Sequence, residues 1–104
     1  MQHTDTIPTR ELRPGFFGKF IPGEKSTVTI WEIKKGSVLE THQHEHEQIT
    51  LVQSGELQMT IGDTNYLFTA GMTHVIPSNT PHSAIALTDV AVIDFFSPAR
   101  DDYR

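Results

Sequence analysis

The strongest constraint on the fold is a series of short β-rich runs, each closed by Gly, Pro, Asn or Asp. In residues 56–61 the apolar side chains of Leu57, Met59 and Ile61 alternate with polar ones, as on a half-buried strand. Similar runs cover residues 26–33, 48–53, 66–70, 73–77, 83–87 and 90–96. Roughly eight such runs, about ten residues apart and without a helical interval, predict an antiparallel sandwich or barrel.

Length and composition narrow the class of protein. The chain has 104 residues, 37% of them hydrophobic, which fits one domain with a modest core. No apolar run approaches the roughly 18 residues of a spanning helix, and the N-terminus lacks a signal-peptide pattern, so we expect a cytoplasmic protein. The absence of cysteine excludes disulfides and Cys-bound zinc. Any metal would be held by nitrogen and oxygen.

Charge is unevenly distributed. The net charge of −5 argues against nucleic acid as a partner. Residues 1–35 hold six basic and four acidic side chains, whereas residues 36–104 hold two basic and nine acidic ones. The two basic residues in this acidic part are Arg100 and Arg104. An arginine there indicates either a specific anion site or a surface salt bridge.

The stretch THQHEHEQ, residues 41–48, is the first candidate site. It carries His42, His44, His46 and Gln48 at alternate positions, which share a face if the segment is a strand. Neutral imidazole is a common ligand for divalent transition metals. His82 follows later, at the end of the proline-framed loop 77–82, and is a plausible fourth ligand. The alternative is a solvated acidic loop with no metal.

These residues resemble the first motif of the cupin family. Gly36 stands five residues before His42, and His44 follows after one residue. Gln48 occupies the place of the family's acidic ligand, and Gly55 closes the motif six residues later. The first motif thus spans residues 36–55.

The second cupin motif is similar to residues 71–86. Gly71 begins it and IPSNTPH ends at His82, although the usual PxG element is Thr69-Ala70-Gly71 and Ala86 replaces the usual Asn. The resemblance covers about half the chain. It implies one all-β domain over residues 1–104, the jelly-roll-like antiparallel cupin barrel or double-stranded β-helix. Residues 1–20 would form an N-terminal extension or an edge strand.

The cupin resemblance also implies a metal site. Its ligands would be His42, His44, Gln48 and His82, around one divalent transition metal ion such as nickel, zinc, manganese or iron. His46 is then expected near the rim rather than among the ligands, because the family's chain bends between His44 and Gln48. Three histidines and a neutral amide leave a divalent ion its full charge, which favours anionic ligands and Lewis-acid chemistry over oxygenase chemistry.

The last run, VAVIDFFSPARDDY, is the second candidate site. Asp94 and Phe96 share one face of a strand, and Arg100 lies just beyond it. A carboxylate among apolar side chains is costly to bury without a partner. Asp94 could pair with Arg100 or a backbone N–H. Alternatively, Asp94 could act as an acid/base with a raised pKa while Arg100 binds a substrate carboxylate.

Together, HxHxHEQ and DxFSPxRxDY resemble the pectin-degradation cupins of the KdgF type. That resemblance implies catalytic roles for Asp94, Phe96 and Arg100, with Asp102 and Tyr103 completing the tail pattern. Those cupins convert 4,5-unsaturated monouronates, released from pectin or alginate, into linear ketonised sugar acids. The expected substrate is therefore a small anionic sugar acid.

Two other functions remain open. One is a small metal cupin that acts as a dioxygenase or isomerase on another acid, and the other is a non-catalytic metabolite-binding cupin. We expect a homodimer, because a small barrel leaves strand edges that a second copy can cover. Neither nucleic acid nor a membrane is an expected partner.

Overall fold

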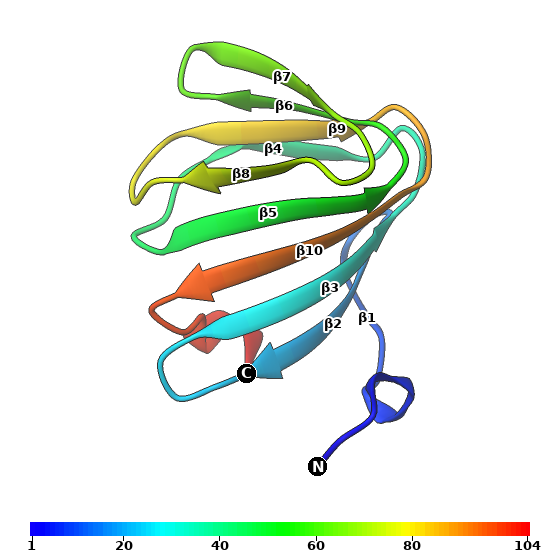
Figure 1. The fold of residues 1–104 in the computed structure, drawn as a ribbon, viewed down its shortest axis with the longest axis vertical. Helices are drawn as coiled ribbons and strands as arrows, with labels where there is room; N and C mark the ends of the chain where they lie inside the picture. Colours follow the sequence, from blue (N-terminus) through cyan, green and yellow to red (C-terminus); the bar gives the residue numbers. More distant parts are fainter.

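The computed structural model describes all 104 residues as two antiparallel sheets that face each other (Figure 1). The larger sheet has the order β1-β2-β3-β10-β5-β8 and the smaller one β4-β9-β6-β7. The elements are η1 (Thr4–Thr6), β1 (Arg10–Arg13), β2 (Phe16–Pro22), β3 (Thr27–Ile33), β4 (Val38–His42), β5 (Glu47–Ser54), β6 (Leu57–Ile61), β7 (Thr64–Phe68), β8 (Thr73–Ile76), β9 (His82–Ala86), β10 (Val90–Ser97) and η2 (Asp101–Tyr103). The predicted all-β antiparallel barrel is confirmed.

The core lies between the sheets and follows from alternation along each strand. In β3 the residues at odd positions are buried, ending with Trp31 and Ile33, while those between them are more exposed. Trp31 makes edge-on aromatic contacts with Phe20, at 5.4 Å between ring centroids, and with Tyr103, at 6.3 Å. Tyr103 belongs to η2, so the C-terminal turn is packed against the aromatic core and secures one end of the barrel.

Two strands were not expected from the sequence. β2 carries apolar side chains on both faces, so its sequence does not show the alternation of apolar and polar residues that indicates a strand. β4 contains no fully buried residue. Residues 1–20 therefore contain a true edge strand, β1, and the start of a second strand, β2. The run predicted over residues 66–70 begins earlier, because β7 starts at Thr64, which pairs with Ile61 across Gly62 and Asp63.

Gly55 shows why a glycine closes the first motif. Its φ is +86°, in the region that favours glycine, and a Cβ there would clash with the carbonyl oxygen of Asp89. This close approach holds the turn after β5 against the start of β10. β5 and β10 are neighbours in the larger sheet, and both carry site residues.

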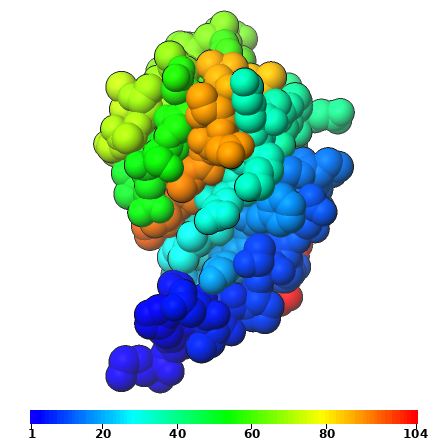
Figure 2. All heavy atoms as spheres, turned by 90° about the vertical axis from the view of Figure 1, so that its right-hand side faces the viewer, coloured from blue at the N-terminus to red at the C-terminus, as the bar shows by residue number.

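The N-terminal residues project from one end of the molecule, whose largest extent is 38 Å (Figure 2). The helical segments are two three-residue turns, and neither could span a membrane.

Candidate functional site

Three histidines meet at one end of the smaller sheet. His42 ends β4 and His82 begins β9, and the two residues pair across these strands. His44 lies in the loop between β4 and β5, where the chain leaves the strand and strict alternation ends. One ring nitrogen from each histidine lies within 4.8 Å of the others. Such a cluster could hold a metal ion.

The far ring nitrogens of these histidines set their orientation. Each Nδ1 lies next to a backbone carbonyl: 3.1 Å from Glu40 for His42, 2.9 Å from His46 for His44, and 2.8 Å from Thr80 for His82. When Nδ1 donates to a carbonyl, Nε2 carries the lone pair that a metal needs. Nε2 of His82 is buried and has no hydrogen-bond partner in the protein. A cation would satisfy that nitrogen.

Burial keeps the three imidazoles neutral. It is the main cause that lowers the pKa values of His42 and His44, and it lowers the pKa of His82 to about 4. The positive charge of Arg100 adds to the lowering for all three. Neutral imidazoles are the form that binds metals, so the cluster is in its ligating state at neutral pH.

Gln48 completes the group from β5. Its side chain is buried, and its Oε1 lies 3.2 Å from Nε2 of His44. If Nδ1 of His44 donates to the carbonyl of His46, this contact brings two lone pairs together, which a shared cation would relieve. The amide nitrogen donates to Oγ1 of Thr50 at 3.0 Å, so the amide oxygen is turned toward the histidines. The four side chains therefore fit a divalent metal ion.

Asp94 lies beside this group on β10. Its Oδ1 accepts a 2.8 Å hydrogen bond from the Thr50 hydroxyl, which links it to Gln48 through one residue. Burial raises the pKa of Asp94 to about 6, against smaller opposing effects from hydrogen bonds and from Arg100. Asp94 is therefore able to exchange a proton near neutral pH.

Arg100 does not form the ion pair with Asp94 that the sequence left open. Its Nε and Nη2 donate to the two carboxylate oxygens of Asp102, at 3.0 and 2.8 Å. Its guanidinium also lies over two aromatic rings, with Cζ 4.2 Å from the ring centroid of Tyr103 and 4.8 Å from that of Phe96. Asp102 and the aromatic rings thus hold Arg100 in a defined position.

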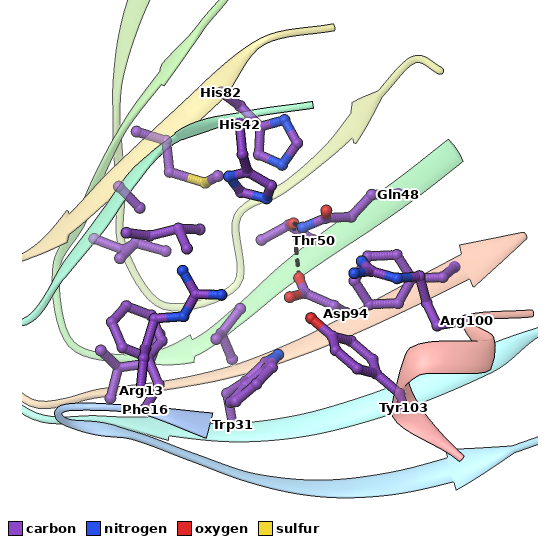
Figure 3. A pocket seen from close by; sticks show the side chains of 17 residues that line it. Arg13, Phe16, Trp31, His42, Gln48, Thr50, His82, Asp94, Arg100 and Tyr103 are labelled. Carbon is purple, nitrogen blue, oxygen red and sulfur yellow. Dashed lines mark hydrogen bonds between the residues drawn. The ribbon is translucent and has the colours of Figure 1, made fainter. Parts of the chain in front are cut away.

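One cavity collects most of these side chains (Figure 3). Of the residues expected from the sequence, His42, Gln48, His82, Asp94, Phe96 and Arg100 line it. His44 joins the three-histidine cluster from the loop, and its ring lies 5.7 Å from that of Phe96. His46 is half-buried outside the three-histidine cluster, and its ring lies 5.4 Å from that of His44.

Sequence reasoning missed two polar residues of the cavity, Thr50 and Arg13. Thr50 is one of several threonines in strands, so its residue type alone does not single it out. Arg13 comes from β1, far from either motif. A signal for Thr50 did exist: it follows Gln48 by two residues and so shares its face.

Comparisons with known proteins agree with this architecture. The cupin domain family model matches residues 29–96. The structure of KdgF from Halomonas sp. is 33% identical, with a TM-score of 0.86, covering 91% of this chain and 89% of that one. An RmlC-like cupin from Shewanella frigidimarina has a TM-score of 0.95 at 24% identity, covering 100% and 95%. A Bacillus subtilis protein named H2HPP isomerase is 48% identical over 56 residues, which are 53% of this chain and 24% of that protein.

Proposed function

The chain belongs to the cupin family, and we propose that it is a metal-dependent enzyme that linearises 4,5-unsaturated monouronates to ketonised sugar acids. The observation that carries the proposal is the buried, protonatable Asp94, joined through Thr50 to the Gln48 amide beside three neutral histidines. Similarity to the KdgF structure supports the substrate class.

The proposed metal ligands are His42, His44, Gln48 and His82. A bound divalent ion would supply Lewis-acid polarisation of a substrate oxygen. The protein supplies no carboxylate ligand in this set, so an anionic substrate meets a site of positive charge. Nickel, zinc, manganese and iron all remain suitable for nitrogen and oxygen ligands of this kind.

The proposed reaction is an isomerisation that needs no co-reactant. The hydroxyl at C1 loses its proton, the C1 carbonyl forms, and the bond from C1 to the ring oxygen breaks. Ring opening leaves an enolate at C5, which becomes a ketone when C4 receives a proton. The proton released from the C1 hydroxyl passes to solvent water, so one proton leaves and one is gained. In this scheme the protonated carboxyl of Asp94 donates the proton to C4, which a carboxyl with a pKa of about 6 can do near neutral pH.

Phe96 and Arg100 shape the proposed substrate site. Phe96 shares the inward face of β10 with Asp94 and offers an apolar wall to the ring. Arg100 keeps one terminal nitrogen, Nη1, outside its two hydrogen bonds to Asp102. That nitrogen and the guanidinium charge can stabilise negative charge that develops on substrate oxygens.

The test is an absorbance assay with the unsaturated monouronate from exhaustive lyase digestion of pectate, and a parallel one with the product from alginate. Loss of the alkene absorbance near ~230 nm should exceed the spontaneous rate, and a chelator should abolish the excess while the metal restores it. A rate equal to the spontaneous one with both products would contradict the proposal. Dependence on dissolved oxygen would instead indicate a dioxygenase.

A second candidate is an isomerase that acts on a different small acid. The relative named H2HPP isomerase supports it, since the match is 48% identical over half of this chain. This chain spans about a quarter of that relative. Turnover of a non-uronate acid, with no acceleration of either uronate, would favour this candidate.

A further inference from the structure

Arg13 reaches the cavity because β1 contains an irregularity. Along the β1–β2 pair, Glu11 lies opposite Phe17 but Arg13 lies opposite Phe16, so Leu12 is an extra residue. Without this bulge Arg13 would share the face of Glu11, two residues earlier. With the bulge it shares the face of Phe16, which is buried in the core. The side chain is thereby directed inward.

Figure 3 shows the consequence for the cavity. The guanidinium of Arg13 points into it from one side, and Arg100 enters from the opposite side, with Asp94 between them. The Cζ of Arg13 lies 5.8 Å from the ring centroid of Phe16.

The guanidinium groups of Arg13 and Arg100 differ in their partners within the protein. The guanidinium of Arg100 is bound by Asp102 through two hydrogen bonds. The ion pairs of the protein join Arg100 to Asp102, Arg104 to Asp101 and His3 to Asp5, and Arg13 takes part in none of them. No hydrogen bond engages the Arg13 guanidinium either. The planar guanidinium of Arg13 is therefore free to donate two parallel hydrogen bonds to a carboxylate.

We propose that Arg13 is the carboxylate-binding residue of the cavity and that it selects substrates carrying a carboxylate. The lining includes two arginines and one carboxyl group, Asp94, so an acid is the complementary ligand. Arg13 lines the cavity and is itself exposed, so an anion from solution can reach it. This inference deepens the proposed function and rests on it for the identity of the acid, but the binding of a carboxylate by Arg13 can be tested separately.

The test uses Trp31, the single tryptophan of the chain, which lines the same cavity. Its fluorescence reports binding of D-galacturonate, a saturated uronate without the reactive alkene, and of the uncharged D-galacturonate methyl ester. Wild-type protein should bind the acid at least about tenfold more tightly than the ester, as expected for hydrogen bonds to a charged group. In Arg13→Gln the preference should fall to within about twofold.

Three variants complete the design. Arg10→Gln removes the same charge from the same strand outside the cavity lining and should keep the wild-type preference. Arg13→Lys keeps the positive charge but cannot donate two parallel hydrogen bonds, so it should retain part of the preference for the acid over the ester. Arg100→Gln tests the competing assignment of the carboxylate to Arg100, and should keep the acid preference.

The proposal is overturned if Arg13→Gln retains the acid preference, or if wild-type protein binds the acid no better than the ester. It is equally overturned if Arg100→Gln alone abolishes the preference. Because the probe is not turned over, these results are independent of the uronate assay. Loss of preference in Arg13→Gln without uronate turnover would sustain the carboxylate site and contradict only the proposed reaction.

Discussion

Thr50 and Asp94 face each other directly across the β5–β10 pair, and the Thr50 hydroxyl donates to the Asp94 carboxyl at 2.8 Å. The same hydroxyl oxygen accepts the Gln48 amide proton. One threonine therefore orients both a proposed metal ligand and the proposed acid. On the other side of Asp94, Thr29 of β3 faces it but has a buried hydroxyl without a partner.

This asymmetry predicts different effects of two similar substitutions. Thr50→Val leaves the Gln48 amide and an Asp94 oxygen unpaired, so it should lower the free energy of unfolding by about 1 to 3 kcal/mol. Through Gln48 it should also weaken metal binding by about 10- to 100-fold. Urea unfolding and calorimetric metal titration measure the two effects. Thr29→Val is the matched control and should change neither, so equal losses in both variants would refute the role of Thr50.

Asp94→Asn should reduce kcat by about a hundredfold or more, because the amide cannot donate a carboxyl proton. Its oxygen can still accept from Thr50, so ligand binding followed by Trp31 fluorescence should remain within a few-fold of wild type. Asp63→Asn, in the exposed β6–β7 turn, is the control. Full activity in Asp94→Asn would exclude Asp94 as the acid, whereas retained binding without turnover would exclude a purely metabolite-binding cupin.

The raised pKa of Asp94 predicts a pH-dependent stability in metal-free protein. A folded pKa of about 6, above the ordinary 3.8, means that the native state holds the proton more tightly. The stabilising contribution is complete below about pH 4 and is lost as the pH rises through 6. Asp94→Asn lacks this carboxyl and its loss of stability. Its free energy of unfolding, relative to that of wild type, should therefore rise by on the order of 2 to 3 kcal/mol between pH 4 and pH 7.

The comparison must be between variants because His82 acts in the opposite direction. Its pKa is lowered to about 4, so its contribution grows as the pH rises from 4 toward 6.5. Subtracting the free energy of unfolding of wild type from that of Asp94→Asn at each pH cancels the contribution of His82, which both proteins share. Urea denaturation across the range measures this difference, and a constant value would contradict a raised pKa for Asp94.

Metal removal should destabilise the protein, because a ligand that binds only the folded state stabilises it. We expect one divalent ion per chain and a melting temperature that rises on loading and falls with a chelator. His82→Ala should abolish tight binding. His46→Ala should keep it, since His46 lies outside the three-histidine cluster. If His46→Ala loses the metal while His82→Ala retains it, the ligand assignment is wrong.

The outer face of the larger sheet supports the expected homodimer. Phe95 faces Ile49 across β10 and β5, and Ile49 faces Val75 across β5 and β8, and all three are at least 37% exposed. An apolar row of this kind is a typical subunit interface. Light scattering should show a dimer that Ile49→Glu converts to a monomer. Ile85→Glu, equally exposed on the smaller sheet, should leave it a dimer.

Local patterns predicted the elements whose side chains have one clear environment. β3 and β6 alternate between buried and exposed positions, so their faces could be assigned from the sequence. The resemblance of residues 36–55 to the first cupin motif implied that His42 and His44 act with His82, and the structure brings these three histidines together. β2 was not predicted, because both of its faces are largely apolar and its sequence shows no clear alternation.

Long-range partners could not be predicted in the same way. The hydrogen bond from Thr50 to Asp94 joins residues 44 positions apart, and the pairing of β5 with β10 creates it. The direction of Arg13 depends on a single extra residue in β1, since one step of register changes the face of every following side chain. Such effects arise from sheet assembly and leave no mark in the local sequence.

The hydrogen bonds of the histidine Nδ1 atoms have a consequence for how the site exchanges its ion. At neutral pH the imidazoles of His42, His44 and His82 are already deprotonated at the nitrogen proposed to bind the metal, and the proposed fourth donor is the amide of Gln48. A cation that enters would displace no proton from its ligands, unlike one bound by thiols. Occupancy of the site would therefore follow the supply of free metal and stay insensitive to acidity above about pH 7.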